Sequence, residues 1–444
     1  MRLAYFSPLP PQRTGVADYS RELLPELARR AEVDLWVDAQ PDKKALPGCR
    51  IFNYANNPGL HKALRGYDAA IYHMGNSAAH RNIYQALMAV PGIVVMHDFV
   101  LHHFFASYYL ESRSSPASYV EEMAYNYGRR GEALASDALM GRRQIWEQEP
   151  LRYPLNYRVL DHARGVIVHS EFARRLIAKS HPHLPAAKVD LAVNVADPAP
   201  DPKALRQRYG LPADRFIIGS LGFGSAAKRL EMVLRAIRAL GSERVLYLVV
   251  GELGDRLRQQ VRGSGLENAV RATGYVEFPA FNDYCNLIDL GIDLRYPTMG
   301  ESSASVCRMM GAGKPCVVSN VGWFAEIPDG CAIKLPPVPD ERTLVNCLSD
   351  LISDQTRRRQ VGGEARKYIR DCHSPAHAAA RYLDFVNQVH SAERSSRLSH
   401  AIIDRTGRAM AELGIGADDD GLVQTMAEQI AALFDSSSGK KCPN

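Results

Sequence analysis

The sequence predicts an α/β protein of two doubly wound, Rossmann-like domains that face a cleft, followed by a helical C-terminal tail. Short, nearly continuous apolar runs alternate with amphipathic helical segments, as in parallel sheets covered on both faces. The alternation stops at a proline-rich stretch, residues 194–205, and then starts again. The chain has 444 residues, 46% of them hydrophobic, which is enough for two full cores. Such sheets bind ligands outside the carboxyl ends of their strands, so we expect ligands in the cleft between the domains.

The apolar runs fall into two series. Strands are predicted at 2–6, 33–37, 69–74, 92–98 and 165–170, and again at 215–222, 244–252, 269–276, 289–296, 314–320 and 331–336. Helical residues at about 104–164, rich in Tyr and Arg, are expected to form an insertion in the first series. We therefore predict an N-terminal domain over 1–195, a C-terminal domain over 205–375, and helices and a tail over 376–444. Gly414 and Gly416 are expected to split that tail into two helices.

The overall composition favours a cytoplasmic enzyme or binding protein. The net charge of +5 is small for this length and no long run of like charges occurs, so no nucleic-acid partner is expected. The N-terminus lacks the pattern of a signal peptide, and no segment is long and apolar enough to span a bilayer. The mild basicity permits peripheral contact with the inner face of a membrane without requiring it. The eight cysteines are scattered without a CxxC pair, so neither a zinc site nor a disulfide framework is expected.

Residues 295–315, RYPTMGESSASVCRMMGAGKP, contain the clearest phosphate-binding pattern. The end of this stretch is not a P-loop, because Arg308 stands where the first glycine is needed and Pro315 follows the lysine. It is predicted instead to end a helix at Gly313. The beginning fits an anion site, since unpaired N–H groups and the helix dipole favour negative charge where a helix starts. The residues that open this helix are Ser302, Ser303, Ala304 and Ser305.

Two charged residues lie beside predicted helix starts in the second domain. Glu301 precedes the helix described above, where its carboxylate could accept hydrogen bonds from sugar hydroxyls, although it could simply favour the helix dipole. Lys228 follows a strand and a glycine turn at Gly222. It could neutralise a diphosphate, and the alternative is a solvated lysine at a helix start.

In the first domain, polar residues follow the ends of three predicted strands. Gly15 lies in the loop after the first strand, His73 and Asn76 lie near the end of another, and His97 and Asp98 end the next. Such groups could bind a hydroxylated ligand or handle a proton, although loops are polar in any case. No metal is expected, because the histidines that follow His97 do not place two imidazoles at i, i+4 on one helical face.

With these positions in view, the sequence resembles a retaining glycosyltransferase of the GT-B fold, in family four, the glycosyl transferases of group 1. The resemblance extends to about residue 390. It is carried by the segments PLPPQRTGVADYSRELLPELA, VVMHDFVLHHFF, GVIVHSEFARR, GSLGFGSAAKRLEMVLRAI and RYPTMGESSASVCRMMGAGKPCVVSNVGWFAEIPDG. Each segment is a weak signal alone, and together they are a strong one.

The resemblance implies that the second domain binds a nucleotide-diphosphate sugar and the first an acceptor. Lys228 matches the diphosphate-binding lysine of the family, and Glu301 matches the first glutamate of its paired motif. The implied donor-binding residues are Gly15, Gly222, Lys228, Arg229, Tyr275, Val276, Glu301, Ser302, Ser303, Ala304, Ser305, Arg308 and Glu326. The implied acceptor-binding residues are His73, Asn76, His97 and Asp98, and the implied catalytic residues are His97, Lys228 and Glu301.

The sequence departs from the family pattern at two places. The second motif glutamate should stand at Met309 or, counted back from the Gly-Lys-Pro end, at Arg308, and neither is acidic. Arg308 or Glu326 could replace its contact with the ribose. The phosphate arginine expected shortly before Lys228 is also missing, and Arg229 could compensate in part.

The expected function is metal-independent transfer of a hexose-type sugar, with retention of configuration and no cofactor, from a nucleotide-diphosphate sugar. The acceptor would be a glycan, a lipid-linked glycan or another hydroxyl compound. One alternative is a catalytically degenerate protein that binds a sugar nucleotide or glycan, which the two departures favour. Another is a GT-B-like sugar-nucleotide epimerase, which should carry several carboxylates in its cleft. The sequence identifies neither the sugar, the nucleotide base nor the acceptor.

Overall fold

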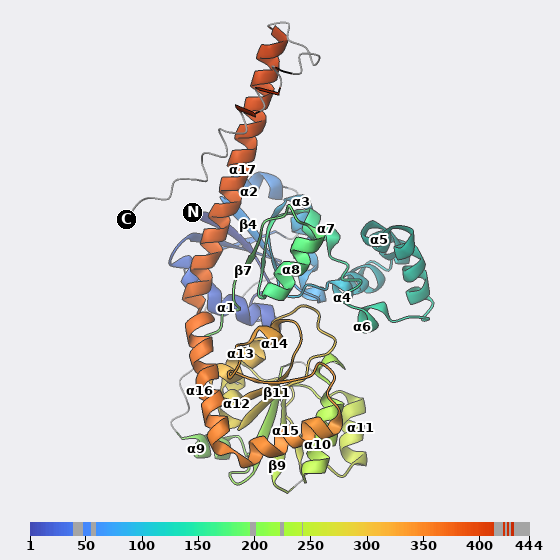
Figure 1. Ribbon diagram of the computed structural model, residues 1–444, viewed down its shortest axis with the longest axis vertical. Helices are drawn as coiled ribbons and strands as arrows, with labels where there is room; N and C mark the ends of the chain where they lie inside the picture. Colours follow the sequence, from blue (N-terminus) through green and yellow to red (C-terminus); the bar gives the residue numbers. More distant parts are fainter. Residues whose placement is uncertain are drawn as a thin grey trace. The chain divides into compact units, whose positions relative to one another are not determined.

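The computed structural model describes residues 1–38, 48–54, 59–195, 201–222, 226–241 and 243–412, together with 421, 424, 425, 428 and 429. The chain divides into two compact units, Met1–Tyr382 and Leu383–Asn444. The first unit contains two parallel-sheet α/β domains (Figure 1), so the predicted fold class is confirmed.

The first domain is built on a seven-stranded sheet of order β3-β2-β1-β4-β5-β6-β7, in which every neighbouring pair is parallel. Its strands are β1 (Arg2–Phe6), β2 (Glu32–Val37), β3 (Arg50–Asn53), β4 (Ala69–Met74), β5 (Gly92–Met96), β6 (Ala163–Val168) and β7 (Ala186–Lys188). The strand order reverses between β1 and β4, and the carboxyl ends beside such a switch point are where doubly wound sheets bind ligands.

Helices cover both faces of this sheet. Successive strand residues point to opposite faces, so Phe6 joins the core beneath α3 and α7 while Tyr5 faces α1 and hydrogen-bonds Ser20 at 3.0 Å. The region between β5 and β6 is helical. The helical elements are α1 (Gly15–Ala28), α2 (Leu60–Leu64), η2 (Ala78–His80), α3 (Arg81–Ala89), α4 (His102–Ala106), η3 (Ser107–Ser112), α5 (Pro116–Leu139), α6 (Ile145–Gln148), α7 (Tyr157–Asp161) and α8 (Glu171–Ser180).

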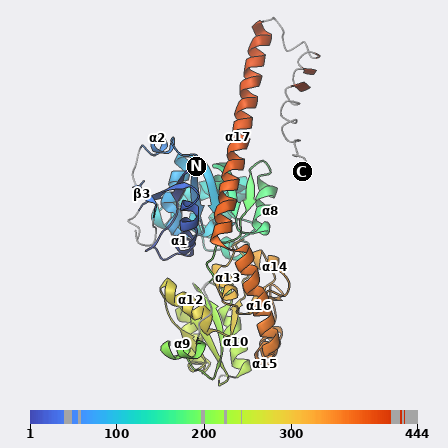
Figure 2. The same ribbon diagram turned by 90° about the vertical axis from the view of Figure 1, so that its left-hand side faces the viewer.

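The second domain is built on a six-stranded parallel sheet of order β10-β9-β8-β11-β12-β13. Helices lie on both of its faces (Figure 2). The strands are β8 (Phe216–Leu221), β9 (Val245–Val250), β10 (Val270–Ala272), β11 (Leu290–Asp293), β12 (Cys316–Ser319) and β13 (Ile333–Leu335). The helical elements are α9 (Pro202–Arg208), η4 (Ala226–Lys228), α10 (Leu230–Leu240), α11 (Asp255–Gly263), α12 (Phe278–Leu287), α13 (Ala304–Gly311), α14 (Trp323–Glu326), α15 (Glu341–Ser353) and α16 (Gln355–Cys372).

After the second domain, the chain returns to the first. The N–H of Val193 donates to the carbonyl of His373 at 2.9 Å. Near the start of α17 (Pro375–Glu412), the Tyr382 hydroxyl lies 2.7 Å from that of Tyr19 in α1. The Tyr382 ring also stacks on His73, with 6.4 Å between ring centroids. Residues far apart in sequence therefore complete the core beside β1 and β4.

Some elements differ from the sequence-based expectation. The edge strands β3 and β7 were not predicted, and α9 begins at Pro202, inside the stretch predicted to be a linker. The helix stop at Gly313 is present, since this residue has a φ of +74° and follows Ala312, the C-cap of α13. The predicted tail split at Gly414 and Gly416 lies outside the described residues.

Candidate active site

The candidate site lies at the switch point of the second sheet, where the strand order reverses between β8 and β11. β8 ends at Leu221, and Gly222 follows with a φ of +93°, a conformation that glycine adopts without strain. A Cβ on Gly222 would lie 3.2 Å from Lys228 Nζ and 2.9 Å from Ser305 Oγ. The glycine turn therefore leaves room in which the lysine amine and the start of α13 meet.

The Lys228 amine is buried but keeps capacity to bind an anion. The side chain is 7% exposed, and Nζ donates to the carbonyl of Leu221 at 2.6 Å. Burial lowers the pKa of Lys228 to about 8, and the negative charge on Asp293 opposes this shift. An ammonium has three donors, so two remain for a ligand. Near neutral pH this group therefore presents positive charge at the switch point.

The N-terminus of α13 supplies further donors. Ser303 is the N-cap, and its hydroxyl accepts from the N–H of Val306 at 3.3 Å and donates to Asp293 at 3.2 Å. The N–H groups of Ala304 and Ser305 belong to the first turn, where an α-helix has no internal partner for them. Ser305, in the first turn of α13, and Lys228 Nζ both lie next to Gly222. The positive end of the helix dipole is therefore on the Lys228 side of the switch point.

Glu301 is held rigidly in front of this helix. One carboxylate oxygen accepts from Arg295 at 2.8 Å, and the other accepts from the Thr298 hydroxyl at 3.0 Å and the Met299 N–H at 2.6 Å. Arg295 also pairs with Asp293 at 3.2 Å. Burial alone would raise the pKa of Asp293. The positive charges of Arg295 and Lys228 outweigh this effect and hold that pKa below its ordinary value. A carboxylate has about four acceptor positions, so Glu301 has one left for a ligand.

The loop that carries Glu301 is packed against the first domain. The N–H of Val100 donates to the carbonyl of Met299 at 2.9 Å. Gly300 has a φ of +75°, and a Cβ there would lie 2.5 Å from the Cβ of Phe99. Only a glycine allows the two backbones to approach this closely, and the approach brings Asp98 toward Glu301.

Asp98 and Asn76 lie together on the first-domain side of this contact. Asp98 Oδ2 accepts from the N–H of Asn76 at 2.9 Å. Burial raises the pKa of Asp98 to about 6, and the nearby charge of Glu301 adds to that effect. The Asn76 side chain is committed elsewhere, since its Oδ1 accepts from the N–H of Phe104 at 2.9 Å and its Nδ2 lies 3.0 Å from His103 Nδ1.

Three histidines form a hydrogen-bonded chain next to Asp98, of which His73 and His169 are buried and His97 is half-buried. His169 Nδ1 lies 2.9 Å from the carbonyl of Val189, which can only accept, so His169 Nε2 must accept in turn. His97 Nδ1 therefore donates to His169 over 3.3 Å, and His73 Nδ1 donates to His97 Nε2 over 3.0 Å. Burial lowers the pKa of His169 to about 4 and those of His73 and His97 well below the ordinary value. The chain is neutral, and both ring nitrogens of His97 are engaged.

The two residues proposed to replace the missing glutamate contact the first domain. Arg308 forms a two-pronged ion pair with Glu22 of α1, at 2.6 and 2.8 Å, with both residues buried. Glu326 accepts from the N–H groups of Glu171 and Phe172 at 2.9 and 2.5 Å, and so caps α8. Both side chains thus join the two domains in this structure.

The other predicted donor residues are more exposed or structural. Arg229 adopts a left-handed φ of +50° and donates to the carbonyl of Pro337 at 3.3 Å. The Tyr275 side chain is 39% exposed, and the guanidinium of Arg13 lies over its ring, 4.2 Å from the ring centroid. The neighbouring residue Val276 is half-buried.

Of the two remaining predicted donor residues, Gly15 is exposed and Ser302 contacts the first domain. Gly15 opens α1 behind the cap residue Thr14, and a Cβ on Gly15 would meet nothing within 4 Å. The Ser302 hydroxyl donates to the carbonyl of His169 at 3.1 Å.

Sequence reasoning missed four residues of this site: Glu22, His169, Asp293 and Arg295. Asp293 and Arg295 gave a signal in the sequence, since they are two opposite charges at the end of an apolar strand. His169 gave one too, because it directly follows β6 just as His97 directly follows β5. Glu22 gave no signal, because it lies among other charged residues of an amphipathic helix.

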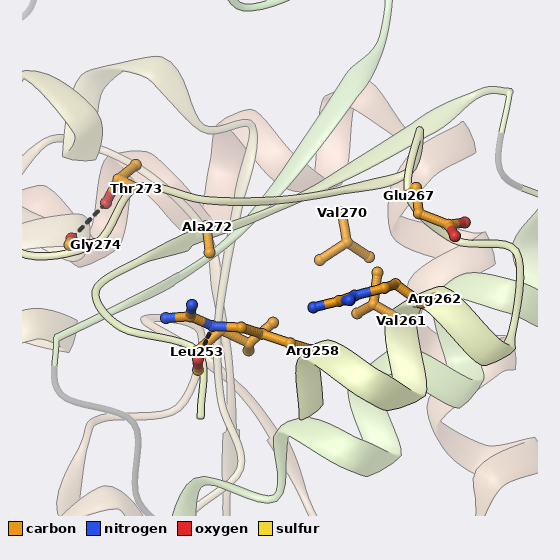
Figure 3. A pocket seen from close by; sticks show the side chains of 9 residues that line it. All are labelled: Leu253, Arg258, Val261, Arg262, Glu267, Val270, Ala272, Thr273 and Gly274. Carbon is orange, nitrogen blue, oxygen red and sulfur yellow. Dashed lines mark hydrogen bonds between the residues drawn. The ribbon is translucent and has the colours of Figure 1, made fainter. Parts of the chain in front are cut away.

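A separate hollow of about 410 Å³ lies at the edge of the second sheet, beside β10. Figure 3 shows Arg258 and Arg262 of α11 extending along it, with Thr273 and Gly274 at one end. It includes neither Lys228 nor Glu301.

In the part of the chain that the structure describes, no group of three or more His, Cys, Asp or Glu residues is arranged to hold a metal ion. Within the same residues, no helix has both the length and the apolar character needed to cross a membrane.

Comparison with known proteins agrees with this architecture. Residues 215–354 match the family described as Glycosyl transferases group 1, a segment that contains both Lys228 and Glu301. No curated protein matches the chain in sequence. Sucrose-phosphate synthase from Thermosynechococcus elongatus has a TM-score of 0.64 to this chain at 16% identity, covering 88% of this chain and 100% of its own. The molecule has the GT-B fold.

Two other GT-B structures are similar. HepE from Anabaena, in complex with UDP and glucose, has a TM-score of 0.62 at 16% identity, covering 87% of this chain and 100% of its own. WaaG, a glycosyltransferase involved in lipopolysaccharide biosynthesis, has a TM-score of 0.57 at 14% identity, covering 85% and 98%.

Proposed function

We propose that this GT-B protein is a retaining, metal-independent glycosyltransferase that moves a hexose-type sugar from a nucleotide-diphosphate sugar to a hydroxyl acceptor. The observation that carries the proposal is the meeting of Lys228 Nζ, Gly222 and the start of α13 at the switch point, with Glu301 fixed beside them. All four lie in the segment that matches the glycosyl transferases of group 1.

The site chemistry suits a departing diphosphate. Lys228 and the N–H groups at the start of α13 would bind the diphosphate and stabilise its growing negative charge as the bond to the sugar breaks. These groups can supply the positive charge that a metal ion supplies in other enzymes. The free acceptor position of Glu301 would receive a donor-sugar hydroxyl. Because Arg295 and Met299 already bind that carboxylate, it is a poor nucleophile. Attack on the same face of the sugar, assisted by the leaving phosphate, would then retain the configuration.

The partners proposed follow from the two domains. The second domain would bind the donor, with UDP as the first nucleotide to test since HepE has been solved with UDP and with UDP-glucose. The first domain would bind the acceptor, a glycan or a lipid-linked glycan. We place the protein in the cytoplasm, with peripheral contact at the inner face of the membrane where the acceptor is lipid-linked.

The test is release of nucleoside diphosphate from a panel of UDP-, GDP- and ADP-sugars, with a chelator present. One donor should be turned over, and Lys228→Ala and Glu301→Gln should each lower the rate by about 100-fold or more, since each removes a group that stabilises the transition state. The exposed residues Lys203 and Glu243 offer matched controls, and Lys203→Ala and Glu243→Gln should leave the rate unchanged. Silence across the panel, with no donor raising the melting temperature, would overturn the donor-binding proposal.

A second candidate function is binding without catalysis. Arg308 and Glu326 are both committed to contacts with the first domain, so neither replaces the missing glutamate in this arrangement. Tight binding of a nucleotide sugar with no turnover would favour this candidate. Conversion of the donor to an isomeric sugar nucleotide, without release of diphosphate, would instead indicate an epimerase.

A further inference from the structure

A histidine and a carboxylate meet beside Gly75, at the switch point of the first sheet. Gly75 directly follows β4, and Asp98 lies two residues after β5, the strand that pairs with β4. A Cβ on Gly75 would lie 2.8 Å from His80 Nε2 and 3.4 Å from Asp98 Oδ2. Both side chains therefore face one point at the carboxyl ends of the strands, where doubly wound sheets bind their ligands.

Position 75 needs a small residue for space rather than for backbone conformation. Gly75 does not have the left-handed φ that favours glycine at other turns of this chain. A larger residue would not strain the backbone, but its Cβ would collide with the His80 imidazole. The glycine therefore keeps side-chain atoms out of the region that His80 and Asp98 share.

His80 presents a lone pair to this region. Its Nδ1 lies 2.8 Å from the carbonyl of His73, which can only accept, so Nδ1 carries the hydrogen. Burial lowers the pKa of His80 to about 4, so the ring is neutral and Nε2 can only accept. Among the residues that the structure describes, Nε2 has no hydrogen-bond partner, and it is not completely enclosed. A buried acceptor without a partner is costly unless a ligand or water satisfies it.

Asp98 presents a second hydrogen-bond acceptor. The N–H of Asn76 holds its Oδ2 at 2.9 Å, and its Oδ1 accepts no hydrogen bond from any described residue. The residue is half-buried, and burial raises its pKa to about 6, which leaves it ionised near neutral pH. The neutral His80 ring offers it no N–H at Nε2, so the two groups cannot satisfy each other. A ligand that donates two hydrogen bonds would satisfy both.

This His80–Asp98 pair lies next to the proposed donor site. Phe99 follows Asp98, and its Cβ would lie 2.5 Å from a Cβ on Gly300, the residue before Glu301. A molecule held by the pair would therefore approach the donor sugar from the first domain.

The other residues expected to bind the acceptor are committed to the protein. Both ring nitrogens of His97 are hydrogen-bonded to histidines, and both side-chain atoms of Asn76 are engaged. His73 Nε2 is completely enclosed. Asp98 and the unexpected His80 thus hold the hydrogen-bonding capacity of this region.

We propose that His80 and Asp98 bind two neighbouring hydroxyl groups of a neutral acceptor sugar, an inference that rests on the proposed glycosyltransferase function. One hydroxyl donates to His80 Nε2 and the other to Asp98 Oδ1. A phosphate or carboxylate in either place has no hydrogen to donate and is repelled by Asp98. The role is in binding alone, because the proton of the attacking hydroxyl passes to the departing diphosphate in same-face attack.

The test uses the full chain, the donor identified in the panel, and the methyl α-glycosides of glucose, galactose and mannose as acceptors. At least one glycoside should raise the release of nucleoside diphosphate above that with water. His80→Asn keeps an N–H in the place of Nδ1 and removes Nε2, so KM for that glycoside should rise about tenfold or more. His80→Gln keeps an acceptor in the place of Nε2 and should recover part of the affinity.

Deoxy analogues of the active glycoside identify the hydroxyl that His80 binds. The analogue that lacks this hydroxyl should show the raised KM with the unaltered protein. With His80→Asn, its KM should rise no further, because the same hydrogen bond is already lost.

Gly75→Ala tests the same region without changing a polar group. The added Cβ would displace the His80 imidazole and should also raise KM for the glycoside. Gly363→Ala is the matched control, since a Cβ on this residue of α16 would meet nothing within 4 Å, and it should leave KM unchanged.

Binding and stability separate this role from a structural one. The affinity for nucleoside diphosphate and the melting temperature of His80→Asn should stay close to those of the unaltered protein, and Gly75→Ala decides if His80→Asn fails to fold. An unchanged KM in the folded variants would overturn the inference and leave the proposed function standing. So would an equal effect of His80→Asn on every deoxy analogue, or the failure of every glycoside to raise release above that with water. If the unaltered protein turns over no donor, both proposals fall.

Discussion

At the scale of single residues, Lys228 shows how burial prepares a group for its ligand. The amine is enclosed at a strand end, and its pKa falls to about 8. Removing it from water has a cost, and only a negatively charged ligand compensates for that cost fully. Lysine is also a compact point charge, which suits a phosphate that leaves during the reaction.

The lowered pKa of Lys228 makes nucleotide binding depend on pH. Lys228 is charged below about pH 8 and loses its charge above it, whereas a terminal phosphate is already fully ionised above about pH 7. The affinity for UDP, or for the diphosphate of whichever donor is turned over, should therefore fall about tenfold per pH unit above pH 8.

Calorimetric titration across this range measures the fall in affinity. Lys228→Ala should bind more weakly and lack the dependence, and Lys203→Ala should retain it. A constant affinity in the unaltered protein up to about pH 9.5 would contradict the assignment.

Single residues of the site were predictable where chemistry follows directly from a strand end. Lys228, Glu301 and Asp98 could be selected as candidates because their positions relative to β8, β11 and β5 can be read from the sequence. Glu22 was not selected, since its role depends on Arg308, a partner far away in the sequence. Arg295 was overlooked although its partners Asp293 and Glu301 lie close to it in the sequence. Arg308 was identified as a departure from the family pattern, but its ion pair with α1 could not be foreseen.

At the scale of elements, the ion pair between α1 and α13 is the most consequential contact. Arg308 and Glu22 are both buried, and the N–H of Asn194 also donates to Glu22 at 3.1 Å. Removing one member leaves the other charge buried without a partner, which costs about 3–5 kcal/mol. This contact ties the helix that begins at the anion site to the first domain.

Glu22→Gln should therefore lower the free energy of unfolding by about 3–5 kcal/mol, measured as a lower urea midpoint by circular dichroism. Glu26→Gln removes the solvent-exposed pairs that Glu26 of α1 makes with Arg29 and Arg30, just beyond the end of that helix, and should change stability by less than about 0.5 kcal/mol. Exchange of the charges, Glu22→Arg with Arg308→Glu, should recover part of the loss. Equal midpoints for Glu22→Gln and Glu26→Gln would show that the buried pair contributes nothing.

The missed elements share a physical reason. β3 and β7 are edge strands of four and three residues, and edges need little apolar surface. Arg50 in β3 pairs with Asp34 of β2 at 2.8 Å, so part of this edge is held by charge rather than by hydrophobic alternation. α9 was obscured by prolines, yet Pro202 stands at its first position, where proline is well tolerated.

At the scale of the whole molecule, the burial of neutral histidines makes stability depend on pH. Burial lowers the pKa of His80, His102 and His169 to about 4, against about 6.5 in an unfolded chain. The unfolded state therefore binds more protons between these values, and stability is complete above pH 6.5 and lost as the pH falls toward 4. The pKa of Asp98 is raised to about 6, so at this carboxyl the folded state binds up to one proton more than the unfolded state as the pH falls below 6. Asp98 therefore offsets part of the stability lost through the histidines.

The melting temperature should accordingly decrease between about pH 6.5 and pH 4.5, each histidine contributing about 1.4 kcal/mol per pH unit. His169→Asn removes one of these groups and should make the decrease shallower. His183→Asn, at an exposed histidine, should leave the slope unchanged. A melting temperature that does not change over this range would show that the buried histidines are protonated in the folded protein.

The two-domain GT-B architecture was predictable because strand and helix patterns are local, and they repeat on both sides of one proline-rich stretch. The contacts that join the domains were not, since they depend on residues such as Glu326 and Phe172 that lie far apart in sequence. Pattern thus predicts each sheet, while specific side chains determine how the sheets meet.

The return of the chain to the first domain has a consequence for its synthesis. Tyr382 stacks on His73 and hydrogen-bonds Tyr19, and His373 pairs with Val193. Domains tend to fold as units, the N-terminal one first, as the chain leaves the ribosome. Here the first domain would emerge without the tyrosine that covers its histidines, and would wait with that core open until the whole second domain had been translated.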